Sequence, residues 1–389
     1  MKTIVSIFVA TIFLPMVSPA QKLLVSPSRS AGMGGYTYYT IPFARRDYTG
    51  TNPYTRQARF LQVHDALSKT PLPIKGLVFR RGCRDESDWP GWKVQVELTL
   101  STAAVTSSTM SRTFASNHGK DATVVVAKKW IQFPPSPYLG LFVNPFAYRI
   151  PFDQGKVFLL GAGKSLAWDA KVYDNDLHKK PGFGGGFDME YAYTRNYAYG
   201  VYTRWGRGVG VPGQSYSFYS YVSTRYDSNY AGREIVLYGG CYNGPPQGKA
   251  FVLLGRKEMP NGIPVSGNGS LLYLNPGTIF FISPIRNLDG RGYGYWSSIP
   301  TSSTPPILAV PDNPALYGAR FYAQVFALDR SLTSFYASNL TRVQMVFPWQ
   351  KAGLFRIGNV YAYNNASAPT GNLGYSSYYR RAMITGFLY

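Results

Sequence analysis

The chain has few of the residues that hold metals or cross-link small proteins. Its 389 residues include only two cysteines and three histidines, at Cys83, Cys241, His64, His118 and His178. These five positions show none of the spacings by which cysteine and histidine bind zinc, so the sequence predicts no metal site. Two cysteines also exclude the small scaffolds that several disulfides hold together.

Acidic residues are scarce as well. Nineteen Asp and Glu residues face 40 Lys and Arg residues, which gives a formal net charge of +21. A surface this basic attracts polyanions such as acidic polysaccharide, lipid headgroups or nucleic acid, and the attraction weakens with salt. We expect an anionic polysaccharide or envelope component as partner and regard nucleic acid as the less favoured one. No motif indicates a cofactor.

No apolar run after the first 20 residues is long enough to span a membrane without a Gly, Pro or charge in it. At the start, Lys2 precedes an apolar run from Ile4 to Val17, and the small residues Ser18 and Ala20 follow. This run is shorter than the roughly 20 residues that cross a bilayer. The pattern is typical of a signal peptide, here residues 1–20. We predict a protein that is secreted or held at the cell surface or in the periplasm, with no membrane span after cleavage.

Export would bring the two cysteines into an oxidising compartment, where an even pair tends to form a disulfide. One interpretation is therefore a bond between Cys83 and Cys241. Two buried free thiols are the alternative, and the sequence leaves both open.

Long amphipathic helices are absent from the pattern, whereas strand-like segments are frequent. The chain holds 32 Tyr, 23 Phe, 40 Gly and 28 Pro, residue types that favour strands or turns. Residues 92–101 (WKVQVELTLS) alternate strictly between apolar and polar, as a half-buried strand does. We predict an all-β fold of two antiparallel β-sandwiches, jelly-roll-like or immunoglobulin-like, with long loops.

Two domains follow from the length and from the distribution of these segments. The N-terminal sandwich is predicted over residues 21–234, including a Tyr/Gly-rich segment at 181–232. The C-terminal sandwich is predicted over residues 235–389, ending in a second Tyr/Gly-rich segment at 350–389.

Motifs that could carry catalysis are weak. Residues 113–126 (TFASNHGKDATVVV) place His118, Lys120 and Asp121 between two strand-like runs. Gly, Asn and Asp are the residues that a turn needs, so we interpret this motif as an inter-strand turn. Residues 161–165 (GAGKS) resemble the end of a phosphate loop but lack its first glycine, because residue 158 is Phe. No catalytic residues are predicted.

A polysaccharide hydrolase remains an alternative, because two carboxylates brought together by the fold can cleave a glycosidic bond. The candidates for such a pair are Glu97, Asp169, Asp188 and Glu190.

The Tyr/Gly-rich segment at 181–232 interleaves tyrosines at two-residue spacing with arginines. Cross-strand aromatic pairs inside a sheet would explain this spacing. A binding surface would explain it too, since Tyr and Arg are enriched where proteins meet partners. For the binding interpretation, the candidates for charge recognition are Arg195, Arg204, Arg207 and Arg225. The candidates for stacking on sugar rings are Trp205, Tyr193 and Tyr199.

Several segments together resemble a known group of proteins. RFLQVHDALS at 59–68, IKGLVFRR at 74–81 and NPFAYRIPFDQGKVFLLGAG at 144–163 are similar to segments of secreted, functionally uncharacterised β-sandwich proteins of planctomycete-type bacteria. GGCYNGPP, PDNPALYGARFYAQVFALD and ASNLTRVQMVF are similar to a second module of those proteins. His64 stands where their pattern usually has an aromatic residue. The resemblance implies two secreted β-sandwich modules and no inherited catalytic residues.

These observations favour a secreted, non-enzymatic binding or structural protein of the cell surface or extracellular matrix that engages anionic glycans. The hydrolase with a carboxylate pair is one alternative. The other is a self-assembling envelope or filament subunit, for which exposed strand edges and large aromatic patches would be the sign.

Overall fold

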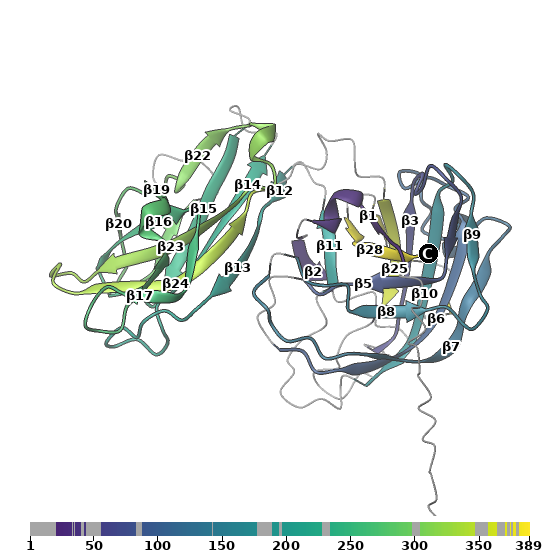
Figure 1. The fold of residues 1–389 in the computed structure, drawn as a ribbon, viewed down its shortest axis with the longest axis horizontal. Coiled ribbons are helices and arrows are strands. Elements are labelled where there is room, and N and C mark those ends of the chain that lie inside the picture. The colour runs from purple at the N-terminus through teal and green to yellow at the C-terminus, as the bar shows by residue number, and fades with distance from the viewer. Residues whose placement is uncertain are drawn as a thin grey trace, which may run out of the picture.

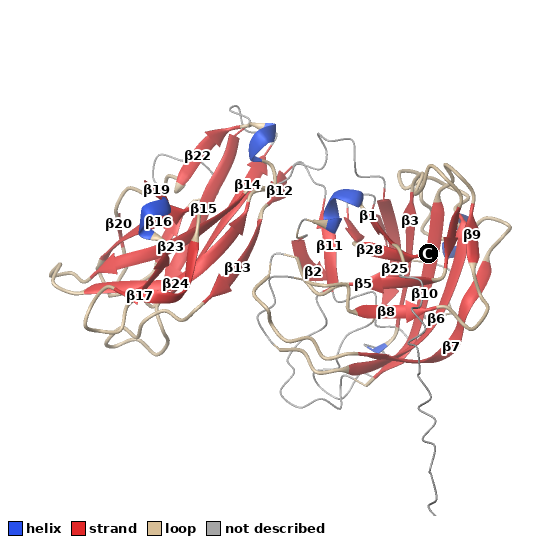
Figure 2. Ribbon diagram, in the orientation of Figure 1, coloured by secondary structure: helices blue, strands red, loops and turns tan. Residues whose placement is uncertain are grey.

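A computed structural model describes residues 21–32, 34, 36–39, 43, 56–82, 88–141, 143–176, 189–193, 197–227, 234–297, 304–346, 357–363, 370–371, 374, 376–378 and 381–389. Within these residues the chain is all-β, as predicted, and no α-helix occurs (Figure 2). The only helical elements described are short 3-10 turns, η1 (Ser28–Ala31), η3 (Phe114–Asn117), η5 (Pro276–Thr278) and η6 (Pro314–Leu316). No helix in the described part of the chain is long and apolar enough to cross a membrane.

The first sandwich is built around a six-stranded sheet that faces a four-stranded one (Figure 1). The six-stranded sheet runs in the order β26 (Ser376–Tyr378), β25 (Ile357–Tyr363), β3 (Ala58–His64), β10 (Leu166–Asn175), β6 (Trp92–Thr102) and β7 (Thr123–Phe133). The four-stranded sheet runs β1 (Leu23–Ser26), β28 (Thr385–Leu388), β5 (Gly76–Phe79) and β8 (Tyr148–Pro151). Smaller sheets join β2 (Tyr36–Tyr39), β11 (Met189–Tyr193) and β27 (Arg381–Met383), and β4 (Leu72–Ile74) with β9 (Phe158–Leu160).

The alternation of residues 92–101 becomes the inner and outer faces of β6. Val94, Val96, Leu98 and Leu100 are fully buried, whereas Lys93 is exposed. The buried face packs into a core rich in aromatic rings, among them Trp92, Phe133 and Tyr148 within 5.5 Å of one another by ring centroid. Period-two alternation therefore identified the core face of this strand correctly.

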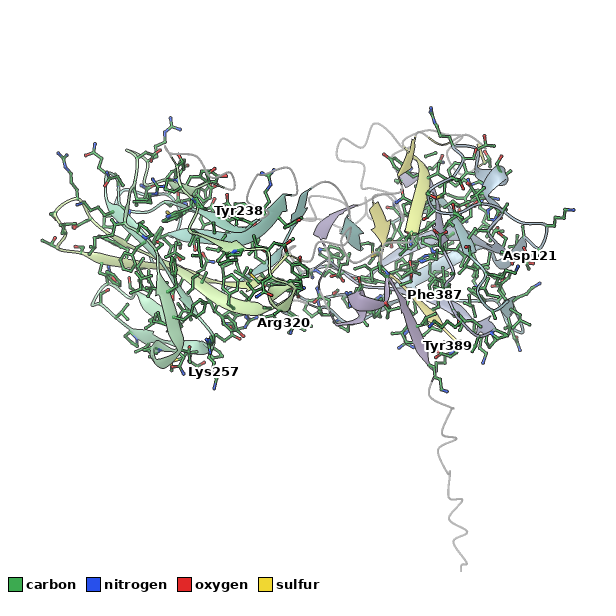
Figure 3. The ribbon with its side chains drawn as sticks, turned by 90° about the horizontal axis from the view of Figure 1, so that it is seen from above. Asp121, Tyr238, Lys257, Arg320, Phe387 and Tyr389 are labelled. Carbon is green, nitrogen blue, oxygen red and sulfur yellow. The ribbon has the colours of Figure 1, made fainter. Side chains whose placement is uncertain are left out.

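The two ends of the described chain meet in one sheet. β1 pairs antiparallel with β28, from Leu23 opposite Leu388 to Ser26 opposite Thr385. Lys22 and Tyr389 exchange two backbone hydrogen bonds beyond this register. The last strands, yellow in Figure 1, thus lie among the first ones. Figure 3 shows Phe387 and Tyr389 in this first sandwich, away from Tyr238, which lies in the other part of the molecule.

The second sandwich packs two antiparallel sheets around its own core. One sheet runs β12 (Tyr197–Tyr199), β14 (Tyr219–Asp227), β15 (Glu234–Tyr242) and β21 (Gly294–Trp296), with β22 (Leu308–Pro311) also on β15. The other runs β13 (Val201–Trp205), β24 (Phe335–Gln344), β23 (Arg320–Leu328), β16 (Lys249–Gly255) and β19 (Ile279–Ile282), with β20 (Arg286–Asn287) also on β16. β17 (Glu258–Pro264) and β18 (Leu271–Leu274) form a separate ribbon.

Strand pairing divides the chain differently from the boundary predicted between residues 234 and 235. β14 and β15 lie on either side of that boundary and pair over eight positions of one sheet. At the other end, β25 and β28 pair with β3 and β5 of the first sandwich, although they fall in the predicted C-terminal unit. The second sandwich is therefore inserted between β11 and β25. Local sequence patterns mark strands but do not report which distant strands pair, and sequential strands are neighbours only about two-thirds of the time.

The disulfide predicted between Cys83 and Cys241 is not formed in the structure. Cys241 is a free thiol that lies on β15 and faces the core of the second sandwich. Burial raises its pKa to about 12, which keeps it protonated and unreactive. Cys83 lies outside the described residues. A core position of this kind suits a cysteine acting as a small apolar side chain.

Candidate functional site

The motif around His118 connects β6 to β7, as the turn interpretation requires, but its histidine is not solvated. His118 Nδ1 lies 2.7 Å from Ser101 Oγ, and Nε2 lies 3.3 Å from Asp169 Oδ2. Asp169 also accepts hydrogen bonds from Arg59, the shortest at 2.6 Å, and the Arg59 guanidinium stacks on the Phe114 ring. The connection is thus held on the outer face of the six-stranded sheet by a buried polar cluster.

A serine, a histidine and an aspartate in contact resemble a hydrolytic triad, but the burial argues for a structural role. Ser101 is fully buried and Asp169 is 1% exposed, so a substrate cannot reach the serine oxygen. Desolvation would raise the pKa of Asp169, yet the hydrogen bonds from His118 and Arg59 outweigh it and lower that pKa. Asp169 is therefore ionised and shared between two donors. This cluster secures the loop rather than activating a nucleophile.

The other acidic candidates for hydrolysis are also occupied. Glu97 pairs with Lys171 at 2.7 Å, and Glu190 pairs with Arg80 in the interior. Asp188 lies outside the described residues. Each described candidate thus faces a cation, whereas glycoside hydrolysis needs two carboxylates facing each other across a substrate. Within the described residues, no group of His, Cys, Asp and Glu side chains is arranged to hold a metal ion.

Tyrosines line the outer face of the sheet that contains β14 and β15. Tyr219 stacks on its cross-strand partner Tyr242 with ring centroids 4.8 Å apart and planes inclined by 14°. Tyr242 also contacts Tyr221 at 6.2 Å and meets the edge of Tyr293 at 5.2 Å. Tyr202 extends the row at 5.7 Å from Tyr221. These rings are only half buried or exposed, so the row presents aromatic surface to solvent.

A pocket of about 640 Å³ opens at one end of this row. Its lining combines aromatic, basic and amide side chains with backbone, namely Arg204, Gly206, Arg207, Gly208, Tyr216, Ser217, Tyr219, Asn243, Tyr293 and Asn339. Tyr216 is 75% exposed and Tyr293 40% exposed at the rim. The volume falls in the range of small-ligand sites.

Two glycines shape the wall of this pocket. A Cβ at Gly208 would lie 1.5 Å from the backbone oxygen of Phe218, and one at Gly206 would lie 2.6 Å from the Tyr273 ring. Gly206 also has a φ of +71°, which side chains rarely adopt. The segment after β13 can therefore press against its neighbours only because both residues are glycine.

The pocket is basic. Arg204 lies over the Tyr219 ring, with its guanidinium carbon 5.6 Å from the centroid. Arg207 is exposed and forms no ion pair among the described residues. Among the residues that the structure describes, no acidic one lines the cavity. Desolvation, together with the neighbouring Tyr242, raises the pKa of Tyr219, so its hydroxyl is neutral and can donate a hydrogen bond.

The seven residues predicted to bind a ligand fall in different places. Arg204 and Arg207 line the pocket. Trp205 lies instead beneath Arg342, 4.5 Å from its guanidinium, and beside Gly140 of the first sandwich. Arg225 lies on β14, six residues from Tyr219 and so about 20 Å along the strand. Tyr193 and Tyr199 lie on β11 and β12, where the structure describes only their backbone, and Arg195 is outside the described residues.

The sequence interpretation missed the residues that complete the pocket from later strands. Tyr293 follows a turn before β21, Asn243 follows directly after β15, and Asn339 lies on β24. Asn339 Oδ1 accepts a hydrogen bond of 2.7 Å from the Ser220 amide and so fixes the neighbouring wall. The tyrosines at 216, 219 and 221 were visible as a repeat, but their partners were not, because those partners are distant in sequence.

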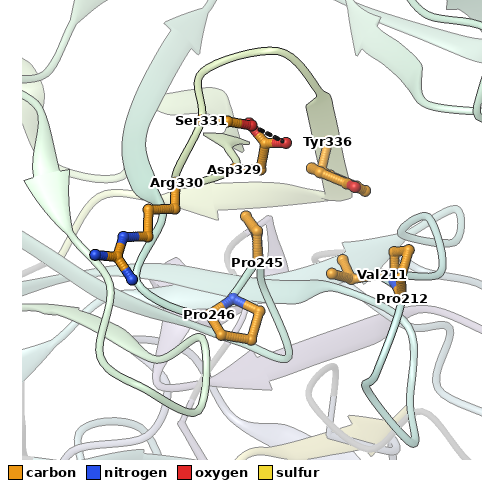
Figure 4. Close-up of a pocket in the computed structure, with 8 residues that line it drawn as sticks. All are labelled: Val211, Pro212, Pro245, Pro246, Asp329, Arg330, Ser331 and Tyr336. Carbon is orange, nitrogen blue, oxygen red and sulfur yellow. Dashed lines mark hydrogen bonds between the residues drawn. The ribbon is translucent and has the colours of Figure 1, made fainter.

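A second pocket of about 530 Å³ also lies in the second sandwich (Figure 4). Its lining is dominated by Val211, Pro212, Pro245, Pro246, Asp329, Arg330, Ser331 and Tyr336. Asp329 turns back on its own loop and accepts a hydrogen bond from Ser331 Oγ at 2.9 Å. Desolvation opposes ionisation, but the amides of Ser334 and Thr333 lower the pKa of Asp329 to about 2. This carboxylate shapes the loop and is not placed as a general acid.

The loops of the first sandwich reach toward the wall behind the basic pocket. Tyr138 donates a hydrogen bond of 2.7 Å to the backbone oxygen of Arg204, and Thr203 donates one of 3.3 Å to Gly140. These contacts hold β13, which carries Arg204, against loops of the first sandwich. No protein-family model matches the chain, and no curated protein matches it.

Proposed function

We propose that the protein is an exported, non-enzymatic binding protein that recognises an acidic polysaccharide at the pocket between Arg204, Arg207 and Tyr293. The observation that carries the proposal is that exposed tyrosine rings and two arginines meet in a cavity whose described lining contains no acidic residue. The excess of basic residues over the whole chain also favours a negatively charged partner.

The chemistry of an acidic sugar fits this lining. The apolar face of a sugar ring packs on an aromatic ring, and Tyr216 and Tyr293 expose ring surface at the rim. A carboxylate or sulfate group accepts charge-assisted hydrogen bonds from a guanidinium, which Arg204 and Arg207 supply. The tyrosine row from Tyr219 to Tyr202 continues the aromatic surface beyond the pocket, as a polymer with several sugar units would use.

Binding of the purified protein to neutral and acidic polysaccharides at several salt concentrations tests this proposal. We expect selective binding to one acidic polysaccharide that persists at moderate salt, because stacking does not depend on salt as ion pairing does. If the protein instead binds every polyanion weakly and salt abolishes this binding, the effect is one of general charge, and a specific binding site is contradicted.

Single substitutions at the pocket are expected to weaken that binding. Arg207→Gln and Tyr216→Ser should each raise the Kd at least about fivefold, since interface Arg and Tyr side chains commonly contribute more than about 1 kcal/mol. Both residues are exposed, so the fold should tolerate these changes. The matched control is Arg149→Gln on β8, which removes the same charge from the first sandwich. An equal loss in the control variant would show that only net charge matters.

A self-assembling subunit is the second candidate, and one observation favours it. β19 lies at the edge of its sheet and exposes Phe280 (49%) and Ile282 (62%). Exposed apolar edge strands can pair with another chain. If this edge drives assembly, sedimentation velocity should show oligomers whose fraction falls sharply in Phe280→Glu. A monomer at all concentrations would remove this candidate.

A further inference from the structure

The short ribbon of β4 and β9 has a buried inner face and an unusually apolar outer face. Leu72, Ile74, Phe158 and Leu160 point into the core of the first sandwich. On the outer face Leu159 lies opposite Pro73 in the register, and Leu159 is 67% exposed. Val157, next to the ribbon, is 51% exposed. Two aliphatic side chains therefore stand in solvent on a part of the fold that the proposed glycan site does not use.

Four lysines surround these aliphatic side chains. Lys75 follows β4 and Lys156 precedes Val157, and both are exposed. Lys69 and Lys164, also exposed, lie in two loops that contact each other, since the Gly163 amide donates a 2.7 Å hydrogen bond to Ser68 and the Leu67 amide one of 3.2 Å to Lys164.

The acids near this cluster are engaged mainly by other groups. Among the described residues, none of the four lysines is within salt-bridge distance of a carboxylate. Asp153, the nearest in sequence to Lys156, is bound by Lys129 and by the Ala127 amide at 2.7 Å. Asp65 is bound by the Ser107 amide at 2.8 Å. The surface is thus an aliphatic centre with a basic border.

We propose that this ribbon docks the protein on an anionic lipid bilayer. Leu159 and Val157 would enter the boundary between headgroups and acyl chains, and the four lysines would meet the lipid phosphates. Exposed apolar side chains combined with a basic border are the features by which peripheral proteins bind anionic membranes. The ribbon lies on the first sandwich and the glycan pocket on the second, so the two sites are separate.

The same features disfavour other occupants. A second copy seated on this surface by twofold symmetry would bring two sets of four lysines together, and like charges repel. A soluble acidic polysaccharide would satisfy the lysines but would leave Leu159 and Val157 in water. Only an anionic surface with an apolar interior satisfies both parts of the ribbon.

Vesicle co-sedimentation tests the proposal with residues 21–389, which lack the predicted signal peptide. The vesicles are phosphatidylcholine alone and phosphatidylcholine mixed with phosphatidylglycerol. We expect partition onto the mixed vesicles only, and about a fivefold loss for each of Lys156→Gln and Lys164→Gln, because one lysine near an anionic membrane contributes about 1 kcal/mol. Leu159→Ser should lower the partition by about tenfold, because it removes most of a leucine side chain from the acyl boundary.

Two control variants make the outcome specific. Lys93→Gln removes an equal charge from β6, and Ile285→Ser removes a similarly exposed aliphatic side chain (62%) from the second sandwich. Unchanged partition in both controls, together with the losses above, supports the proposal. Equal binding to neutral vesicles, no effect of Leu159→Ser, or an equal loss in either control would overturn it. Arg207→Gln should leave partition onto vesicles unchanged. The proposed glycan site and the proposed lipid site can therefore be tested independently of each other.

Discussion

Glu190→Gln is expected to lower the free energy of unfolding by about 3–5 kcal/mol, because it removes one partner of a fully buried ion pair. The side chains of Glu190 on β11 and Arg80 after β5 are both 0% exposed, and they are joined by a hydrogen bond from Arg80 Nε. Arg80 also donates a 2.6 Å hydrogen bond to the backbone oxygen of Ser30 and lies 4.9 Å from the Phe146 centroid. The neutral amide would remove the carboxylate charge that faces this buried guanidinium.

Urea denaturation of this variant and of a matched control measures the effect. Glu97→Gln breaks the pair between Glu97 and Lys171, whose side chains are 20% and 24% exposed, and should cost about 1 kcal/mol or less. The double substitution Arg80→Leu and Glu190→Leu should recover part of the loss, because it leaves no unpaired charge in the core. A loss for Glu190→Gln no larger than for Glu97→Gln would contradict the buried pair.

Acidification is expected to destabilise the protein through His64, a histidine on β3. His64 lies in the core, 1% exposed, with its ring edge against Phe387 at 5.1 Å. Its Nε2 accepts a hydrogen bond of 3.1 Å from Trp168 Nε1, which can only donate. Nδ1 therefore carries the proton and donates to Ser26 Oγ at 2.9 Å. The native site holds a neutral ring.

Desolvation lowers the pKa of His64 from 6.5 to about 3 in the folded state. The unfolded chain binds the proton below pH 6.5, whereas the folded one does not until about pH 3. The stability that depends on the neutral ring is complete above pH 6.5 and is lost as the pH falls toward 3, by about 1.4 kcal/mol per pH unit.

The pH dependence of urea unfolding between pH 7 and 4 tests this assignment. His64→Phe should be less stable at neutral pH, since Trp168 Nε1 loses its acceptor, but its stability should fall less steeply with acid than that of the unchanged protein. Comparing the slopes of the two proteins cancels the contributions of the titrating groups that both share. Identical slopes in the two proteins would mean that His64 is not held neutral in the core.

The strands were predictable because their information is local. The period-two pattern of β6 identified its buried face, and the Gly- and Pro-rich segments marked turns. The pairing of β28 with β1 was not predictable in this way, because no local pattern links residue 388 to residue 23. The boundary placed at residue 234 failed to match the sheets for the same reason.

The candidate site was predictable in part. The arginines at 204 and 207 were found because they interrupt a tyrosine repeat, and both line the pocket. Trp205 was a reasonable stacking candidate by residue type, but its ring packs beneath Arg342. Tyr293 and Asn243 come from other turns of the sandwich, and only the folded sheet brings them to Tyr219. The motif around His118 contains residue types that can catalyse reactions, but in the structure His118 holds a loop through its contacts with Ser101 and Asp169.

We propose above all that an acidic sugar occupies the pocket beside Tyr219. The most direct measurement is a crystal structure of the protein with an oligosaccharide of the acidic polysaccharide that it binds best. We predict a sugar ring packed on Tyr216 or Tyr293, with its acidic group within hydrogen-bond distance of Arg204 or Arg207. An empty pocket, with the oligosaccharide bound at another surface, would rule out a sugar site beside Tyr219.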